Sequence, residues 1–146
     1  MPITFVPSAG DVLLCEWGPD PRDPTTFPLH APPVGVAPEF YKRRHAAVLS
    51  ASATGDLVLV APFSTVPPVK TEAYHHRIAG GAYPFFDAAR DSWLKGDSLT
   101  SVSRARLDRL YFQGRYQRAR LNPADTLAVR AAILNALALG RLIPHL

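Results

Sequence analysis

Five polar residues of types used in acid–base and phosphate chemistry stand at the ends of apolar segments of this chain. Arg44 comes just before an apolar run, and Ser64 and Thr65 come just after the next one. Lys95 and Asp97 are two residues apart, so an extended backbone would place them on the same face. Cations, hydroxyls and a carboxylate suit chemistry at a phosphodiester, where negative charge develops on phosphorus.

The same residue types also occur at ordinary strand ends, so spacing alone leaves a polar surface as the alternative. For RNA cleavage without a metal, one group must take the proton of the 2′-hydroxyl and another must donate a proton to the leaving oxygen. The other cations and hydroxyls would hold the charge on phosphorus. The need for a 2′-hydroxyl would make the substrate RNA.

Other kinds of site are disfavoured by the sequence. His75 and His76 are adjacent in an expected strand, so their side chains point to opposite faces and cannot bind one metal together. No set of cysteines or carboxylates with metal-ligand spacing accompanies them, and we expect neither a metal nor a cofactor. The sequence has no phosphate-binding glycine loop, nucleophile elbow or dinucleotide fingerprint. Cys15 lies in an apolar strand pattern and is expected to be a buried small hydrophobe.

Length and composition favour one domain over residues 1–146, because 47% of the 146 residues are hydrophobic. No apolar run is long enough to cross a bilayer, and we expect no membrane association. The N-terminus lacks the charged, apolar and small-residue order of a signal peptide. A single cysteine cannot form an internal disulfide, so we expect a cytoplasmic protein.

Basic side chains are concentrated in the later part of the chain. The net charge is +4, but the first 40 residues carry −4 and the remainder +8. The two basic clusters are Lys42, Arg43 and Arg44, and Arg104, Arg106, Arg109, Arg115, Arg118 and Arg120. Such clusters are expected either of a polyanion partner or of a solvated basic face. The residues expected to contact RNA are Lys42, Arg43, His45, His76, Arg104 and Arg106.

The order of apolar and turn segments predicts a mainly β fold with a closing helix. Strands are expected over 12–17, 46–50, 57–63, 73–78, 99–103 and 115–121, with a short helical turn over 104–110. Residues 18–39 contain seven prolines, which exclude this segment from a sheet interior and predict a long loop. Residues 79–93 are expected to form an irregular aromatic insertion.

The C-terminal helix is predicted over 122–140. Asn122 is a favourable N-cap, Pro123 suits the first helical position, and Asp125 in the first turn complements the helix dipole. The helix is apolar on most sides, which is typical of a helix buried against more than one partner. Self-association and deep burial within the monomer both satisfy this pattern.

Several short segments, in this order, resemble the MazF/PemK family of toxins. Residues 10–14 (GDVLL) resemble its opening strand, and 42–50 (KRRHAAVLS) resemble its Arg-Pro-Val-Val-Val-Leu-Ser strand. Residues 60–65 (VAPFST) are similar to the strand that ends in Pro-x-Ser/Thr-Thr/Ser. Residues 95–98 (KGDS) fall where members carry Arg-Cys-Asp-Gln or a variant, and 106–110 (RLDRL) with the closing helix continue the match. The resemblance covers most of the chain.

This resemblance implies an α+β fold, an SH3-like antiparallel β-barrel with a C-terminal helix that forms a homodimer. It also implies a metal-independent endoribonuclease toxin that cleaves single-stranded RNA to a 2′,3′-cyclic phosphate and binds a cognate antitoxin protein. The alternative is a barrel without catalysis that binds nucleic acid or a protein through its basic face. Tyr111, Phe112 and Tyr116 lie among the arginines, and aromatic side chains with cations can hold single strands.

The resemblance also implies roles for the five polar residues. Arg44 would stabilise the phosphorane or act as the acid, and Thr65 with Ser64 would hold the phosphate. Asp97 would be the general base. Lys95 would replace an arginine, supplying a point charge without a bidentate fork.

Three positions depart from the pattern of the family that the chain resembles. His45 stands where that family usually has proline, Gly96 where cysteine is frequent and Ser98 where glutamine is common. His45 would share the proton transfer, because its ordinary pKa is near neutrality, or would face away from Arg44 along the strand.

Overall fold

The computed structural model describes residues 3–18 and 42–146, so the loop predicted at 18–39 lies outside the described residues except for Gly18. The strands are β1 (Asp11–Glu16), β2 (Arg43–Ala51), β3 (Leu57–Ser64), β4 (His75–Ile78), β5 (Ser92–Lys95), β6 (Thr100–Ser103), β7 (Leu107–Asp108), β8 (Leu110–Phe112), β9 (Arg115–Gln117) and β10 (Ala119–Arg120). The helical elements are η1 (Gly96–Ser98), η2 (Arg104–Arg106), α1 (Pro123–Ala136) and η3 (Gly140–His145).

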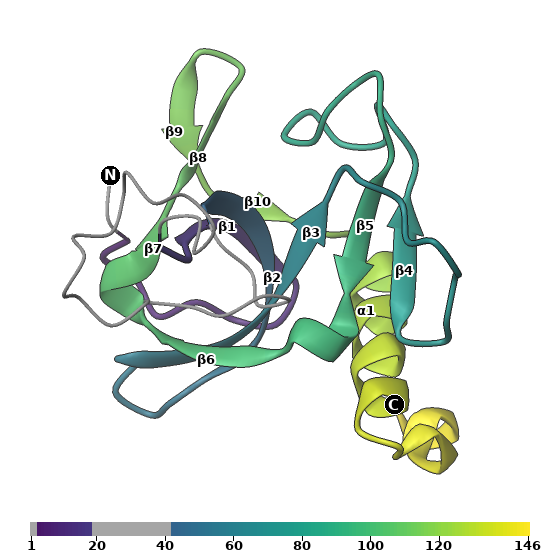
Figure 1. Ribbon diagram of the computed structural model, residues 1–146. Coiled ribbons are helices and arrows are strands. Elements are labelled where there is room, and N and C mark those ends of the chain that lie inside the picture. Colours follow the sequence, from purple (N-terminus) through teal and green to yellow (C-terminus); the bar gives the residue numbers. More distant parts are fainter. Residues whose placement is uncertain (1–2, 19–41) are drawn as a thin grey trace, which may run out of the picture.

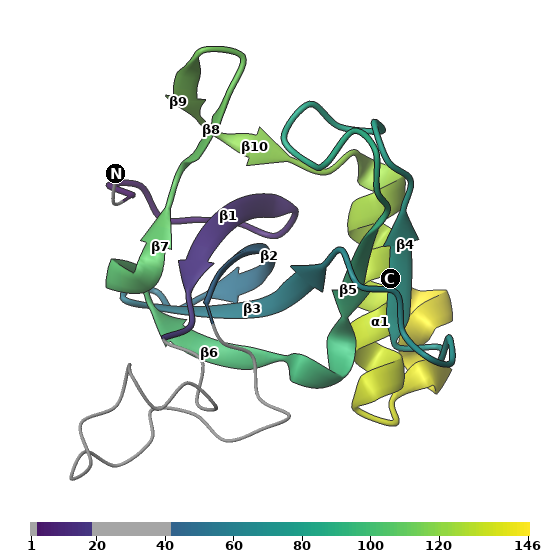
Figure 2. The same ribbon diagram turned by 45° about the horizontal axis from the view of Figure 1, so that its top comes forward.

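The main sheet is antiparallel, with the strand order β10-β1-β2-β3-β5-β4. In addition, β6 pairs with β3 and β7 pairs with β1. Strands β1, β2, β3, β6 and β7 therefore surround one interior, and the η2 turn joins β6 to β7 (Figures 1 and 2). The predicted fold class is confirmed, although the barrel is not closed: in the described part of the chain β6 and β7 do not pair and are only joined through η2.

The barrel interior is filled by side chains of alternate strand residues, as expected for strands with one face in a core. Leu13, Val58 and Val60 are fully buried there with Leu107 from β7. Cys15 belongs to the same core, and burial raises the pKa of its thiol to about 12. The prediction of a buried, unreactive Cys15 is thus confirmed.

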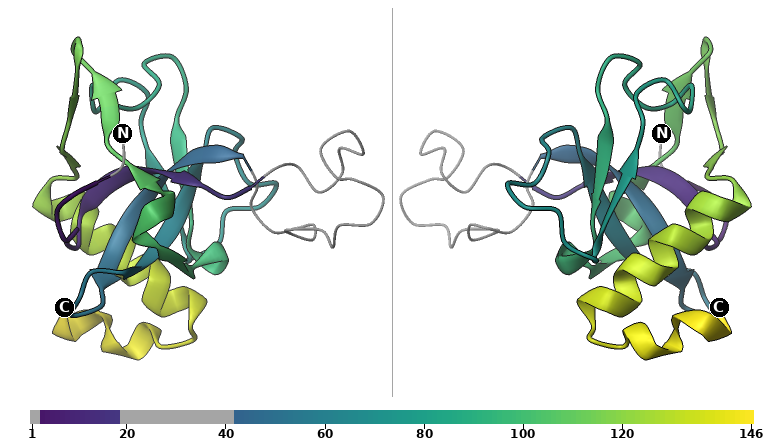
Figure 3. Two further views of the ribbon diagram at one scale, coloured as in Figure 1. Left: turned by 90° about the vertical axis from the view of Figure 1, so that its left-hand side faces the viewer. Right: turned by 90° about the vertical axis from the view of Figure 1, so that its right-hand side faces the viewer.

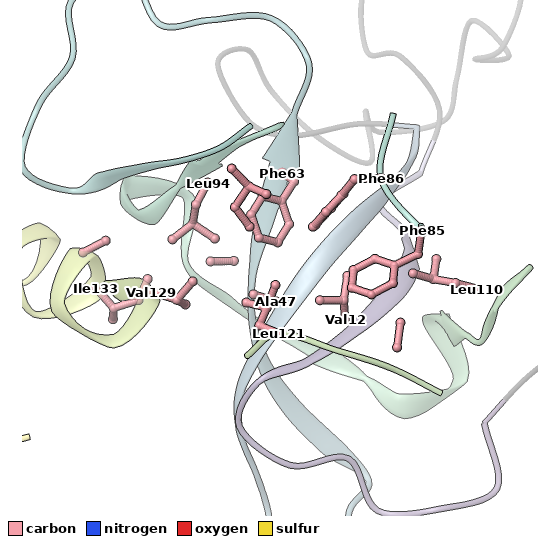
Figure 4. Packing of buried hydrophobic residues seen from close by; sticks show 14 residues of the cluster. Val12, Ala47, Phe63, Phe85, Phe86, Leu94, Leu110, Leu121, Val129 and Ile133 are labelled. Atoms are coloured by element: carbon pink, nitrogen blue, oxygen red, sulfur yellow. The ribbon is translucent and has the colours of Figure 1, made fainter. Parts of the chain in front are cut away.

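Helix α1 packs on the other face of the sheet (Figure 3). Val129 and Ile133 from α1 join Phe63 from β3 and Leu94 from β5 in a second core (Figure 4). The helix begins as predicted, because the Asn122 side chain accepts a hydrogen bond of 2.7 Å from the backbone N–H of Asp125.

The structure corrects four predictions of local structure. The helical turn expected over 104–110 is only the three residues of η2, because Leu107 enters the barrel core and Leu110 the second core from extended backbone. The strand expected over 115–121 is divided, and β8 with β9 forms a separate two-stranded sheet. The insertion expected over 79–93 ends at Asp91, where β5 follows, and α1 ends before 140.

Candidate active site

Most of the predicted catalytic residues lie on one face of the strands β2, β3 and β5. Ala46 pairs with Pro62 in antiparallel register. Arg44, two residues before Ala46, and Ser64, two residues after Pro62, therefore lie on the same face of the sheet as this pair. Ser64 pairs with Trp93 in β5, and Lys95 lies two residues after Trp93. We call this the site face; His75 of β4 belongs to it because it pairs with Lys95.

The opposite face of the same strands, here the helix face, is covered by α1 and by the segment 79–91. His45 lies there with its ring 5.3 Å from that of Phe86, and burial lowers its pKa, partly offset by a hydrogen bond with the Phe85 backbone. His76 also lies there, with Nε2 2.9 Å from Asp125 Oδ1 of α1. Two residues expected to contact RNA, His45 and His76, are therefore on the far side of the sheet from Arg44.

Asp97 is placed beside the site face by close packing of η1. The Gly96 N–H donates to the Tyr74 carbonyl at 3.0 Å, and a Cβ on Gly96 would lie 2.5 Å from that oxygen and 3.3 Å from the Ala132 carbonyl of α1. A side chain at position 96 would therefore push η1 away from β4 and α1. This contact explains why position 96 of this chain is a glycine.

A turn at Glu72–His75 holds the His75 ring in one orientation. The His75 N–H donates to the Glu72 carbonyl, and the Glu72 N–H donates to His75 Nδ1, both at 3.0 Å. Helix α1 supports the turn, because the Asn135 side-chain amide donates to the Ala73 carbonyl at 3.1 Å. Helix α1 thus positions both η1, with Asp97, and the turn that holds His75.

The hydrogen bond from Glu72 assigns the tautomer of His75. Since Nδ1 accepts a hydrogen bond from the backbone, the ring proton of neutral His75 is on Nε2. Partial burial and the nearby Lys95 ammonium lower the pKa of His75, against the opposing effect of Asp97 and Glu72. At neutral pH, His75 is therefore an uncharged hydrogen-bond donor through Nε2.

The other polar groups of the site face are partly covered. Partial burial also lowers the pKa of Lys95, and Asp97 opposes this shift. Ser64 is buried, and its Oγ accepts a hydrogen bond of 3.1 Å from the Val66 N–H, which leaves its own proton to donate. Arg44 and Thr65 are partly exposed, and Asp97 is exposed.

The remaining basic residues expected to contact RNA are spread over the surface. Arg43 forms an ion pair with Asp108 on the side opposite to Arg44. Arg104 pairs with Asp56 at the β2–β3 turn, the far end of that hairpin from Ser64. In contrast, Arg106 donates to the Glu16 carbonyl at the strand end next to Arg43, and exposed Lys42 directly precedes β2.

Residues 3–18 and 42–146 contain no group of three or more His, Cys, Asp or Glu side chains that could hold a metal ion. No helix in the described part of the chain is long and apolar enough to span a membrane.

Residues 9–137 match the family described as PemK-like, MazF-like toxins of type II toxin–antitoxin systems. The chain belongs to this family. An uncharacterized protein of Haemophilus influenzae is 33% identical over 114 residues, covering 74% of this chain and 73% of that protein. The Escherichia coli K12 protein YifN is 32% identical over 115 residues, 75% of this chain and 76% of YifN.

Solved structures of low sequence identity share the fold. An endoribonuclease from Mycobacterial species has a TM-score of 0.56 at 15% identity, over 92% of this chain and 94% of that one. A Mycobacterial endoribonuclease solved with its cognate antitoxin has a TM-score of 0.57 at 17% identity, over 91% of this chain and 96% of that one. Mycobacterium tuberculosis toxin MazF-mt6 has a TM-score of 0.52 at 21% identity, over 69% and 92%.

Two residues of the site face were missed by the sequence analysis. His75 was recognised only as facing away from His76, and the pattern did not decide which of the two faced Arg44. Trp93 was assigned to an irregular insertion, although it pairs with Ser64 and with Arg77 of β4. Alternation within 92–95 would have grouped Trp93 with Lys95 if the strand had been recognised.

Proposed function

We propose that this chain is a toxin with metal-independent endoribonuclease activity on single-stranded RNA in the cytoplasm. The observation that carries the proposal is the shared face of Arg44, Ser64, Lys95 and His75, with Asp97 held beside them by η1. Family membership supports the toxin assignment. The Mycobacterial neighbours described as endoribonucleases support the reaction type.

The proposed reaction is an internal transfer at phosphorus. The 2′-oxygen attacks the adjacent phosphorus while Asp97 takes its proton, so a P–O2′ bond forms and the P–O5′ bond breaks. The departing 5′-oxygen takes a proton from the Lys95 ammonium, whose lowered pKa suits a proton donor. The products are a 2′,3′-cyclic phosphate and a 5′-hydroxyl.

The other groups hold the charge that develops on the phosphoryl oxygens. Arg44 supplies a guanidinium that can bind two oxygens, and the hydroxyls of Ser64 and Thr65 donate to the same group. His75 donates from Nε2 as a neutral group and cannot act as the base while Glu72 occupies its Nδ1. Lys42 and Arg106 lie at the strand ends near Arg44 and would contact the RNA backbone.

The partners of the chain follow from the same proposal. One structural neighbour was solved with its cognate antitoxin, and we expect an antitoxin that covers the site face. We also expect a homodimer, because Leu127 of α1 and three leucines that follow the helix, Leu137, Leu142 and Leu146, are about half exposed. Sedimentation velocity of the purified chain tests this expectation.

The second candidate function is RNA binding without catalysis. It is favoured by the exposed aromatic and basic side chains of the β8–β9 hairpin, which lie outside the site face. Binding of RNA without any cleavage product would select this function.

The decisive experiment incubates the purified chain with single-stranded RNA in excess chelator. Cleavage is expected, with cyclic phosphate ends, and an RNA with a 2′-deoxy nucleotide at the cut position should stay intact. Asp97→Asn should lower turnover about 10²- to 10⁴-fold. It should bind the 2′-deoxy RNA as tightly as the wild type or more tightly, because a negative charge is removed from a phosphate site.

Asp56→Asn is the matched control, since Asp56 is an exposed carboxylate at the β2–β3 turn. Its turnover should equal that of the wild type. Unchanged turnover in Asp97→Asn would assign the base to another residue, and cleavage of the 2′-deoxy RNA would exclude the proposed reaction.

A further inference from the structure

The β8–β9 hairpin projects from the barrel (Figures 1 and 2) and presents two exposed tyrosines. Tyr111 and Tyr116 are paired across the hairpin, with ring centroids 5.1 Å apart and planes at 68°. Their exposed fractions are 63% and 50%. The inner side of the hairpin is different, because Leu110 is buried and the Phe112 ring lies 5.4 Å from that of Phe85. The hairpin is thus attached through Leu110 and Phe112, and the tyrosines contribute little to the packing of the chain.

The outer surface continues from the tyrosines toward the N-terminal segment. Arg109 lies two residues before Tyr111 and Arg118 two residues after Tyr116, so alternation places them on the same side. Both guanidinium groups lie over the ring of Phe5, at 5.6 Å and 4.9 Å from its centroid. We call this row of five side chains the Tyr–Arg strip: Phe5, Arg109, Tyr111, Tyr116 and Arg118.

The strip has an excess of positive charge. Residues 109–121 include four arginines and no acidic residue. Arg118 and Arg120 both pair with the buried carboxylate of Asp11, which leaves one of these two charges uncompensated. Within residues 3–18 and 42–146, Arg109 has no ion pair, and its only hydrogen bond is a long one of 3.5 Å to the Thr4 hydroxyl.

We infer that the Tyr–Arg strip is a second binding surface for single-stranded RNA, outside the cleavage site. Stacking on aromatic side chains holds unpaired bases without regard to sequence, and nearby cations hold the phosphates. Alternate residues of a strand are about 7 Å apart, so rings and cations alternate along the strip. An acidic peptide would use the cations but has no bases to stack on the two exposed rings.

The strip begins near the end of β2 that carries Arg44. Arg109 follows Asp108, which forms an ion pair with Arg43, the neighbour of Arg44 in β2, on the side of the strand opposite to Arg44. A single RNA that contacts both surfaces would therefore have to pass around this strand end. The inference depends on the proposed substrate class but not on the cleavage chemistry, because the strip holds none of the reacting groups.

The test compares Tyr111→Ala/Tyr116→Ala with Tyr111→Phe/Tyr116→Phe, a matched pair that removes or keeps the rings. The probes are uridine oligomers of 16 and 4 nucleotides, fully 2′-O-methylated so that no 2′-hydroxyl can attack. The alanine pair should bind the 16-mer at least about tenfold more weakly, and the phenylalanine pair within about twofold of the wild type. Arg109→Gln should lower the slope of log affinity against log salt by about 1.

Equal affinity of the alanine and phenylalanine pairs for the 16-mer would overturn the inference. The inference would also be overturned if binding of a polyglutamate peptide depended on the two tyrosines and binding of the 16-mer did not. Thermal unfolding of both pairs confirms that they are folded. If the wild type cleaves RNA but the alanine pair binds the 16-mer as tightly as the wild type, the strip is not an RNA-binding surface and the proposed activity stands. If binding depends on the tyrosines but the wild type does not cleave RNA, the proposed activity is wrong and the strip stands.

Discussion

The two faces of the β2–β3–β5–β4 sheet differ in how their polar groups are satisfied. On the helix face, His76 and Tyr83 both bond to the Asp125 carboxylate, and the Asn122 N–H donates to the Tyr83 oxygen. On the site face, His75 uses only Nδ1, and its Nε2 proton makes no hydrogen bond within residues 3–18 and 42–146. Adjacent histidines of one strand thus have different roles, because alternation sends one to a closed network and the other to an open surface.

Structural and functional polar residues of this fold can be distinguished by the face on which they lie. Groups of the helix face have protein partners for most of their donors and acceptors, so their loss should lower stability. On the site face, Ser64 and His75 each keep a proton that no residue in 3–18 or 42–146 accepts, so loss of either group should lower activity and leave stability nearly unchanged.

The largest effect should come from Arg44→Ala, tested against Arg43→Ala. Loss of a cation that stabilises charge in the transition state should lower kcat/KM about 10²- to 10³-fold. Arg43 is one residue away but pairs with Asp108 on the opposite side, so its loss should change kcat/KM by less than about threefold, as for an exposed ion pair. Single-turnover RNA cleavage measures both variants. Equal losses of kcat/KM in the two variants would show that the site face is not specifically required for cleavage.

The next effect concerns the Nε2 donor of His75. His75→Asn keeps an acceptor for the Glu72 N–H but has no donor at the distant ring position, so kcat/KM should fall about tenfold or more. His75→Gln can place an amide N–H near that position and should retain activity within about threefold. If His75→Asn kept more activity than His75→Gln, the contact of Nδ1 with the Glu72 N–H, and not the Nε2 donor, would be the feature of His75 that supports cleavage.

The pH dependence of kcat/KM in these variants also shows whether His75 acts as a hydrogen-bond donor or as a base. The charged groups near His75 are Lys95, Asp97 and Glu72. Because the pKa of His75 is lowered, the ring stays neutral at pH 7 and gains a proton only below its ordinary value of about 6.5. That proton must go to Nδ1 and displaces the Glu72 N–H, so wild-type activity should decline there. His75→Gln should lack this decline.

The smallest effect is on stability. Tyr83 donates to Asp125 Oδ2 at 2.5 Å, so Tyr83→Phe should lower the free energy of unfolding by about 1 kcal/mol at pH 7. Activity per folded molecule should not change. Tyr111→Phe removes an exposed hydroxyl and should change stability by less than about 0.5 kcal/mol. Urea unfolding measures both variants.

Acid should reduce the difference between wild type and Tyr83→Phe. Burial raises the pKa of Asp125, but hydrogen bonds from Tyr83, His76 and Asn122 outweigh it and lower the pKa overall. A carboxylate with a lowered folded pKa contributes stability above its unfolded value and loses it as pH falls through the folded value. The difference should therefore persist at pH 5 and diminish below about pH 3.8. A difference that grows in acid would contradict the assigned bond.

Local patterns predicted several elements because the interactions that form them are close in sequence. The β2–β3 hairpin follows from two apolar runs around a short turn, and the start of α1 from the Asn122 cap. The helical turn over 104–110 was wrong, because leucines three residues apart in extended backbone enter two different cores. The local pattern of one sequence does not show that the sheet has a separate hydrophobic core on each side.

Residue order alone predicts the family, the antiparallel fold class, the buried Cys15 and the opposite directions of His75 and His76. These properties follow from local residue patterns and from the two-residue repeat of an extended backbone. In contrast, packing between distant segments brings His75 to Arg44 and Lys95 and places His45 and His76 under α1 and the segment 79–91. Which side of a strand becomes a site depends on where α1 packs, and the Gly96 contact that places Asp97 joins three segments distant in the sequence.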